Sequence, residues 1–147
     1  MAGKLRTIIR LHRWRLDEER RSLAEVLRQL EAKQSALGIL EDEIRAEQES
    51  AMADPAIAGQ VYAAFARAAI DRRETLVRTI AAAEEATSRQ RERVQACWRE
   101  LRTFELAEES RMRREAAEAA RLERLALDEI ALLRQARAAK SERTDTG

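Results

Sequence analysis

The chain has 147 residues, of which 37% are charged and 3% are aromatic, and its formal net charge is +1. A globular domain needs bulky residues for its core and turn residues to fold back on itself, and this chain, with one proline and four glycines, is poor in both. Its abundant alanine, leucine, glutamate and arginine favour long helices or a coiled coil, and the balanced charge argues against a disordered chain.

The first predicted helix covers residues 3–50. Alternating steps of four and three residues from Leu5 to Ile44 reach twelve positions, nine of them apolar. An apolar period of 3.5 held over this length predicts a coiled coil. The twelve positions of this seam are Leu5, Ile9, His12, Leu16, Glu19, Leu23, Val26, Leu30, Lys33, Leu37, Leu40 and Ile44.

The only proline, Pro55, marks the one credible reversal of the chain, a turn at about residues 51–58. Asp54 can cap the following helix, with Pro55 at its first position. The second predicted helix covers residues 59–139 and is followed by a frayed tail at 140–147. We therefore predict a single all-α domain over residues 1–147, an antiparallel two-helix coiled coil whose second helix is the longer. The alternative is a parallel homodimer of long helices with a kink at Pro55.

The second helix carries a weaker seam that is richer in alanine, whose small side chains let two helices approach closely. Beyond Phe104 its apolar pattern is expected to lose register at Glu108 and to resume at Leu122. The thirteen seam positions are Tyr62, Ala66, Ala69, Arg73, Leu76, Ile80, Ala83, Thr87, Gln90, Val94, Cys97, Leu101 and Phe104.

The second helix extends about 35 residues past the start of the first, or about 50 Å at 1.5 Å per residue. An isolated helix of this length is only marginally stable in water. This segment nevertheless has an apolar stripe at helical spacing, which we interpret as a docking surface for another protein. Self-association and folding back onto the hairpin are the alternatives. The stripe comprises Leu122, Leu125, Ile130, Leu132 and Leu133.

The tip of the hairpin is a second candidate surface, because residues 51–70 contain only two charged groups. Exposed apolar patches of this kind usually mark an interaction site. The alternative is that the last turn of the hairpin closes on itself. The apolar residues concerned are Met52, Val61, Tyr62, Phe65 and Ile70.

A third candidate surface lies near the N-terminus, where Arg10, Arg13 and Trp14 belong to a basic, partly apolar outer face. Such a face suits an acidic protein, an anionic lipid or a nucleic acid. Residues 17–50 hold ten acids against five bases, so the basic character of the first helix is confined to this end. That placement favours a local electrostatic contact over general nucleic-acid binding.

Catalysis requires a convergent set of groups in a pocket that excludes water, and two paired helices provide none. His12 is the only histidine, so no histidine pair is available for a metal. Both His12 and Cys97 fall on the seams, where register and packing are the expected roles. No apolar run reaches the roughly 18–20 residues needed to span a bilayer. We expect a non-enzyme without a catalytic, cofactor or metal site.

The chain resembles the FliJ family of the flagellar type III export apparatus over nearly its whole length. Its opening, LRTIIRLHRWRLDEERRSLAEVLRQLE, has the family's basic start followed by an arginine-rich helix. The segment ERLALDEIALLR at 123–134 resembles the family's C-terminal pattern, with Glu123, Asp128 and Glu129 matching it. Leu125 departs from that pattern, because the family usually has lysine there. The injectisome stalk proteins of the YscO type are similar.

The resemblance implies a cytoplasmic stalk at the inner-membrane export apparatus, needed for flagellum assembly and motility. Such stalks insert into the hexameric export ATPase, promote its assembly and activity, and contact the cytoplasmic part of the export-gate membrane protein. Some family members also bind free export chaperones. On this interpretation the 122–133 stripe, with Asp128 and Glu129, and the basic N-terminal face meet the ATPase, and the tip faces the gate.

Two other classes of protein remain open from the sequence. One is a structural coiled-coil spacer without an ATPase partner, which a seam continuing evenly to the C-terminus would favour. The other is a binder of membrane surfaces or nucleic acid acting through residues 4–15, which steep salt dependence of binding would favour.

Overall fold

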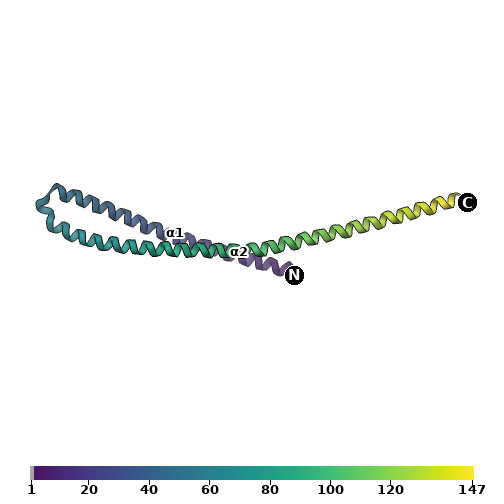
Figure 1. Ribbon diagram of the computed structural model, residues 1–147, viewed down its shortest axis with the longest axis horizontal. Coiled ribbons are helices and arrows are strands. Elements are labelled where there is room, and N and C mark those ends of the chain that lie inside the picture. Colours follow the sequence, from purple (N-terminus) through teal and green to yellow (C-terminus); the bar gives the residue numbers. More distant parts are fainter. Residues whose placement is uncertain (1) are drawn as a thin grey trace. The chain divides into compact units, whose positions relative to one another are not determined.

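The structure is a computed structural model that describes residues 2–147, except for the side chains of residues 57 and 58. Residue 1 of the predicted domain lies outside this description. The chain forms helix α1, Ala2–Ala53, and helix α2, Pro55–Asp145. Figure 1 shows the two helices running back along each other from the turn. The predicted antiparallel helical hairpin with a longer second helix is therefore confirmed.

The turn is shorter than the eight residues expected from the sequence. Only Asp54 is non-helical between the two helices, and its backbone N–H donates to the Ser50 carbonyl oxygen at 3.3 Å. Proline at the first position of a helix needs no hydrogen-bond partner and already has a helical φ, so α2 begins at once with Pro55. At its other end α2 continues to Asp145, past the expected end at residue 139.

The two seams pack as the heptad pattern predicts. All twelve predicted positions of α1 are buried or half-buried, and so are twelve of the thirteen in α2. Arg73 is the exception: it is exposed and donates from Nη2 to the Glu41 carboxylate at 3.4 Å. The most deeply buried side chain is Leu40, at 2% exposure. The small side chains of Ala69 and Ala83 are also buried in this seam.

A polar layer interrupts the apolar seam at Gln90 and Thr87, which are both buried. The Gln90 amide Nε2 donates to the backbone oxygen of Glu19 at 3.1 Å and to its carboxylate. The Thr87 hydroxyl donates to the Ala83 carbonyl oxygen at 2.8 Å. A buried polar group that is satisfied in only one alignment fixes the register of a coiled coil. Glu19 and Gln90 therefore specify how the helices align.

The described residues form two compact units. One is the hairpin body, residues 10–101, which contains the turn and most of both seams. The other comprises residues 2–9 of α1 with residues 102–147 of α2. Each unit carries one or more of the surfaces predicted from the sequence.

Candidate interaction surfaces

In the second unit the seam turns from apolar to charged without losing its register. Glu108 and Arg111 occupy the two heptad positions after Phe104, and both are half-buried. The expected loss of register at Glu108 therefore does not occur, and only the type of residue changes there. The Glu108 carboxylate lies 3.5 Å from the Arg6 guanidinium of α1 and 2.8 Å from that of Arg111. Arg111 also pairs with Glu115.

These contacts shift the ionisation of the charged layer. Hydrogen bonding from Arg111 holds the pKa of Glu108 below its usual value, and the same bond holds the pKa of Arg111 above its own. Seven residues beyond Arg111, the hydrogen bond from Arg121 likewise lowers the pKa of Glu118. The charged forms of these carboxylates therefore favour the folded helix.

We expect the charged layer to weaken in acid. Because the folded-state pKa of Glu108 is depressed, its contribution is fully present above the ordinary glutamate value of 4.5 and is lost as the pH falls below it. Thermal melts followed by circular dichroism from pH 7 to pH 3 test this. The variant Glu108→Gln should lose less stability over this range than the wild-type chain does, and equal losses would contradict the assignment.

Beyond Arg111 every residue of α2 is exposed, and this C-terminal segment carries the predicted stripe. The heptad continues through it without a break: Leu122, Leu125, Glu129 and Leu132 follow the seam at steps of three and four. Leu125 is 52% exposed and Leu132 is 66% exposed. The heptad positions that pack on α1 in the hairpin are therefore occupied by exposed leucines in this segment. We call Leu122, Leu125, Asp128, Glu129 and Leu132 the C-terminal face; Ile130 and Leu133 are exposed beside it.

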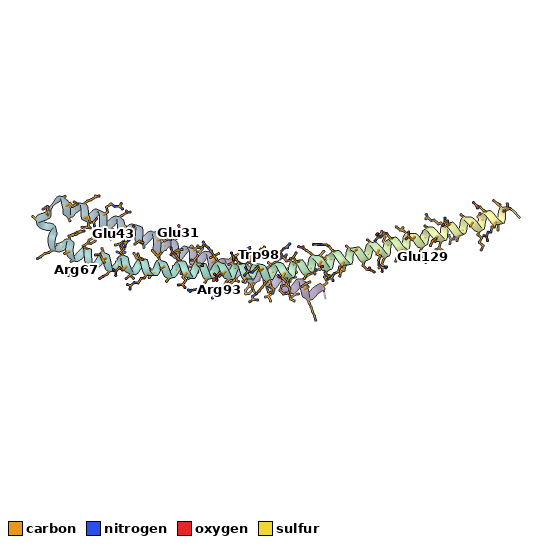
Figure 2. The ribbon with its side chains drawn as sticks, viewed as in Figure 1. Glu31, Glu43, Arg67, Arg93, Trp98 and Glu129 are labelled. Carbon is orange, nitrogen blue, oxygen red and sulfur yellow. The ribbon has the colours of Figure 1, made fainter. Side chains whose placement is uncertain are left out.

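The C-terminal face also carries two acidic residues, Asp128 and Glu129. Among the residues that the structure describes, neither Asp128 nor Glu129 makes a hydrogen bond or an ion pair. Figure 2 shows Glu129 on the C-terminal part of α2. Asp128 and Leu132, with Ala131 and Gln135, line a shallow open hollow. Covering Glu129 with apolar surface alone would leave a buried unpaired charge, which is unfavourable.

At the tip the predicted residues divide into two groups. Met52 is 83% exposed and Val61 is 75% exposed, whereas Tyr62 and Phe65 are half-buried. Met52 and Tyr62, with Gln48 and Ala51, line an open hollow beside the turn. The tip therefore both closes on itself and leaves apolar side chains in contact with solvent.

In the structure, residues of α2 extend the basic N-terminal face that the sequence predicts on the first helix alone. Trp14 is 61% exposed on the outer side of α1, and Arg10 and Arg13 are also exposed. The contacts of His12 with Glu100, at 3.6 Å, and of Glu19 with Gln90 align this part of α1 with residues 90–100 of α2. Residues 10–16 and 89–99 together contain seven arginines and one acid. We call this combined region the basic end.

Sequence reasoning missed the contribution of α2 to the basic end, which consists of four arginines and the exposed Trp98. Figure 2 shows Arg93 and Trp98 on the part of α2 that lies alongside α1. The signal was present as the run RQRERVQACWR, but only the pairing of the helices joins it to residues 10–16. The exposed Leu106, Met112 and Leu127 were also not singled out.

No chemical site emerges from the part of the chain that the structure describes. His12 lies in the seam beside Glu100, and the free thiol of Cys97 is half-buried in the same seam. Over residues 2–147 no three histidine, cysteine or acidic side chains gather as a metal-binding group. Neither described helix has an apolar stretch that could cross a membrane.

Comparison with known proteins gives one finding. A family model described as Flagellar FliJ protein matches residues 1–140. No curated protein and no solved structure matches the chain.

Proposed function

This chain belongs to the FliJ family of coiled-coil proteins associated with flagellar export, and from that premise we propose that it is the stalk of the export ATPase. In this proposal the chain docks into the hexameric ATPase, promotes its assembly and activity, and links it to the cytoplasmic part of the export gate. It acts by binding alone, in the cytoplasm, at the periphery of the inner-membrane apparatus.

The C-terminal face is the observation that carries the proposal. Leu122, Leu125 and Leu132 occupy seam positions, yet all three are exposed in the described part of the chain. Exposed apolar surface of this extent on a long single helix is unfavourable in water unless a partner buries it. An ATPase ring that encloses the helix provides apolar and cationic groups from several subunits at once. Such a site supplies the cation that Glu129 needs.

The basic end supports the same docking. Its arginines lie on every side of the hairpin, because their heptad positions differ: Arg13 flanks the seam, Arg15 is on the other flank, and Arg99 of α2 lies opposite the seam. A flat surface could engage only one of these sides. A ring lined by acidic groups engages all of them, and it attracts the hairpin electrostatically.

The exposed apolar tip is then the part of the hairpin that faces the export gate. Met52 and Val61 offer an apolar surface at the turn, remote in sequence from the C-terminal face. A tip of this kind suits an apolar groove on the gate protein, or on the export chaperones that some family members bind. Closely related YscO-type injectisome stalks would use the same surfaces.

The residues of the C-terminal seam agree less well with a structural coiled-coil spacer than with a stalk. In a parallel pair of C-terminal segments, each heptad position faces its own copy. Glu115, Glu118 and Glu129 would then each meet an identical carboxylate, which is destabilising. The even apolar seam that such a spacer requires is interrupted at four successive positions, Glu108, Arg111, Glu115 and Glu118.

Docking would stimulate the ATPase by stabilising one arrangement of its subunits, since a ligand shifts such an equilibrium only through differential affinity. The test is ATP hydrolysis by the cognate export ATPase, at low ATPase concentration, with and without this protein. We expect stimulation together with a sedimentation shift to a hexamer. If neither stimulation nor co-sedimentation occurs, the stalk proposal is wrong.

A further inference from the structure

The exposed apolar residues of the hairpin body are not spread evenly around it. Nine large apolar side chains are exposed among those that the structure describes in residues 10–101. Two seam residues that are three apart form a pair in each heptad. Four of the exposed side chains directly follow the second residue of such a pair, and none directly precedes the first, which is the equivalent position on the other side of the seam. The four residues are Leu27, Ile70, Val77 and Trp98.

In an antiparallel pair of helices, these heptad positions from both helices line the same side of the hairpin. The Glu43–Arg72 ion pair, at 4.0 Å, joins the equivalent positions of the opposite side and confirms this alignment. One side, which we call the apolar flank, thus carries Arg20 and Leu27 from α1 and the row Ile70, Val77, Glu84, Arg91 and Trp98 from α2. A single helical hairpin has nothing to cover this row.

We propose that the apolar flank binds the same flank of a second copy of this chain, with the two hairpins antiparallel. The flank is self-complementary about a two-fold axis that passes between Glu84 and Arg91. In that arrangement Trp98 packs on the partner's Val77, and Leu27 packs on the methylene groups of the partner's Arg20. Arg91 pairs with the partner's Glu84. Each of these contacts occurs twice.

Charge complementarity and the size of the side chains both favour the antiparallel arrangement. Among the described residues, neither Glu84 nor Arg91 makes a hydrogen bond or ion pair within its own chain, so both are available to a partner. Small residues, Ala24 and Ser88, lie next to the axis and let the helices approach closely. A parallel arrangement would instead place Arg20 over the partner's Arg91 twice, which brings four guanidinium groups together without a counter-charge.

The inference goes beyond the proposed docking and does not depend on it. Its consequence for that docking is competition, because the dimer covers Arg91 and Trp98 of the basic end. The dimer would therefore hold the protein in a form that cannot enter an enclosing ring, and dilution or a stronger partner would release it. Self-association would then regulate how much stalk is free to dock.

The test uses the purified full-length chain alone, in sedimentation velocity and light scattering over a concentration series. We expect a concentration-dependent species with twice the chain mass of 16.8 kDa. Arg91→Glu and Glu84→Arg should each raise the dimer dissociation constant at least ~10-fold, because each places like charges together twice. The double variant should restore dimerisation to within roughly threefold of wild type, since its pairs are reversed but intact.

A matched control tests whether dimerisation depends on the apolar flank or on any exposed apolar residue. Val77→Asp should abolish the dimer, whereas Ile39→Asp, at a more exposed apolar position on another side of the hairpin, should leave it unchanged. A chain that stays monomeric throughout the concentration series overturns the proposal. So does a double variant as weak as its single parents. Neither result bears on ATPase stimulation, which is measured separately.

Discussion

The double variant Leu125→Asp, Leu132→Asp is expected to abolish stimulation of the export ATPase and to leave the helicity of the hairpin largely unchanged. Both leucines are more than half exposed on the C-terminal face, so their replacement removes little packing among the described residues. Two added carboxylates beside Glu129 would make that face strongly acidic and would have to be desolvated on docking. ATP hydrolysis at saturating stalk protein measures the loss, and circular dichroism measures the helicity.

The matched control for this variant is Ala120→Asp with Leu127→Asp. Both positions lie on the opposite side of the same helix, and Leu127 is as exposed as the leucines of the C-terminal face. The control introduces the same two aspartates, with the same cost of helix propensity, about 0.5–0.7 kcal/mol each. Stimulation should survive in the control. If both double variants stimulate fully, or if both fail, the C-terminal face is not the docking surface.

The heptad period alone predicted most of the fold. The seam stepped from Leu5 to Ile44 is buried or half-buried at every position, even where the residue is polar, as at Glu19 and Lys33. This success has a simple cause, since a two-helix coiled coil has one contact geometry and one period. The ends of the helices were harder to place. At the turn, Asp54 and Pro55 reverse the chain within a single non-helical residue.

The interaction surfaces were less predictable, because they depend on which segments the fold brings together. Arg10, Arg13 and Trp14 were recognised as a surface, but the arginines at 89–99 join them only through the alignment that Glu19 and Gln90 fix. The apolar flank has the same origin. Leu27 and Val77 each look like an isolated apolar residue in the sequence, and they share a side of the hairpin only after the seams are paired.

The limit of sequence reasoning is clearest for Leu40 and Leu125, which occupy the same heptad position in their helices. We expect Leu40→Ala to lower the free energy of unfolding by about 2–5 kcal/mol, because this side chain is 2% exposed and its loss leaves a cavity between the helices. Leu125→Ala should change it by less than about 0.5 kcal/mol, because Leu125 is 52% exposed and packs against no other helix. Urea unfolding of the isolated chain measures both values.

A large loss of stability in Leu125→Ala would show that the C-terminal face is already covered within the chain or by another copy, and it would remove the reason for seeking an external partner there. With the ATPase bound, we expect the same measurement to show a clear loss of stability in Leu125→Ala. A leucine that contributes nothing to the isolated hairpin then contributes to the complex, because binding supplies the missing neighbours. The heptad pattern predicts where a partner helix or surface packs, and only the measured free energies of unfolding show whether this chain itself provides that partner.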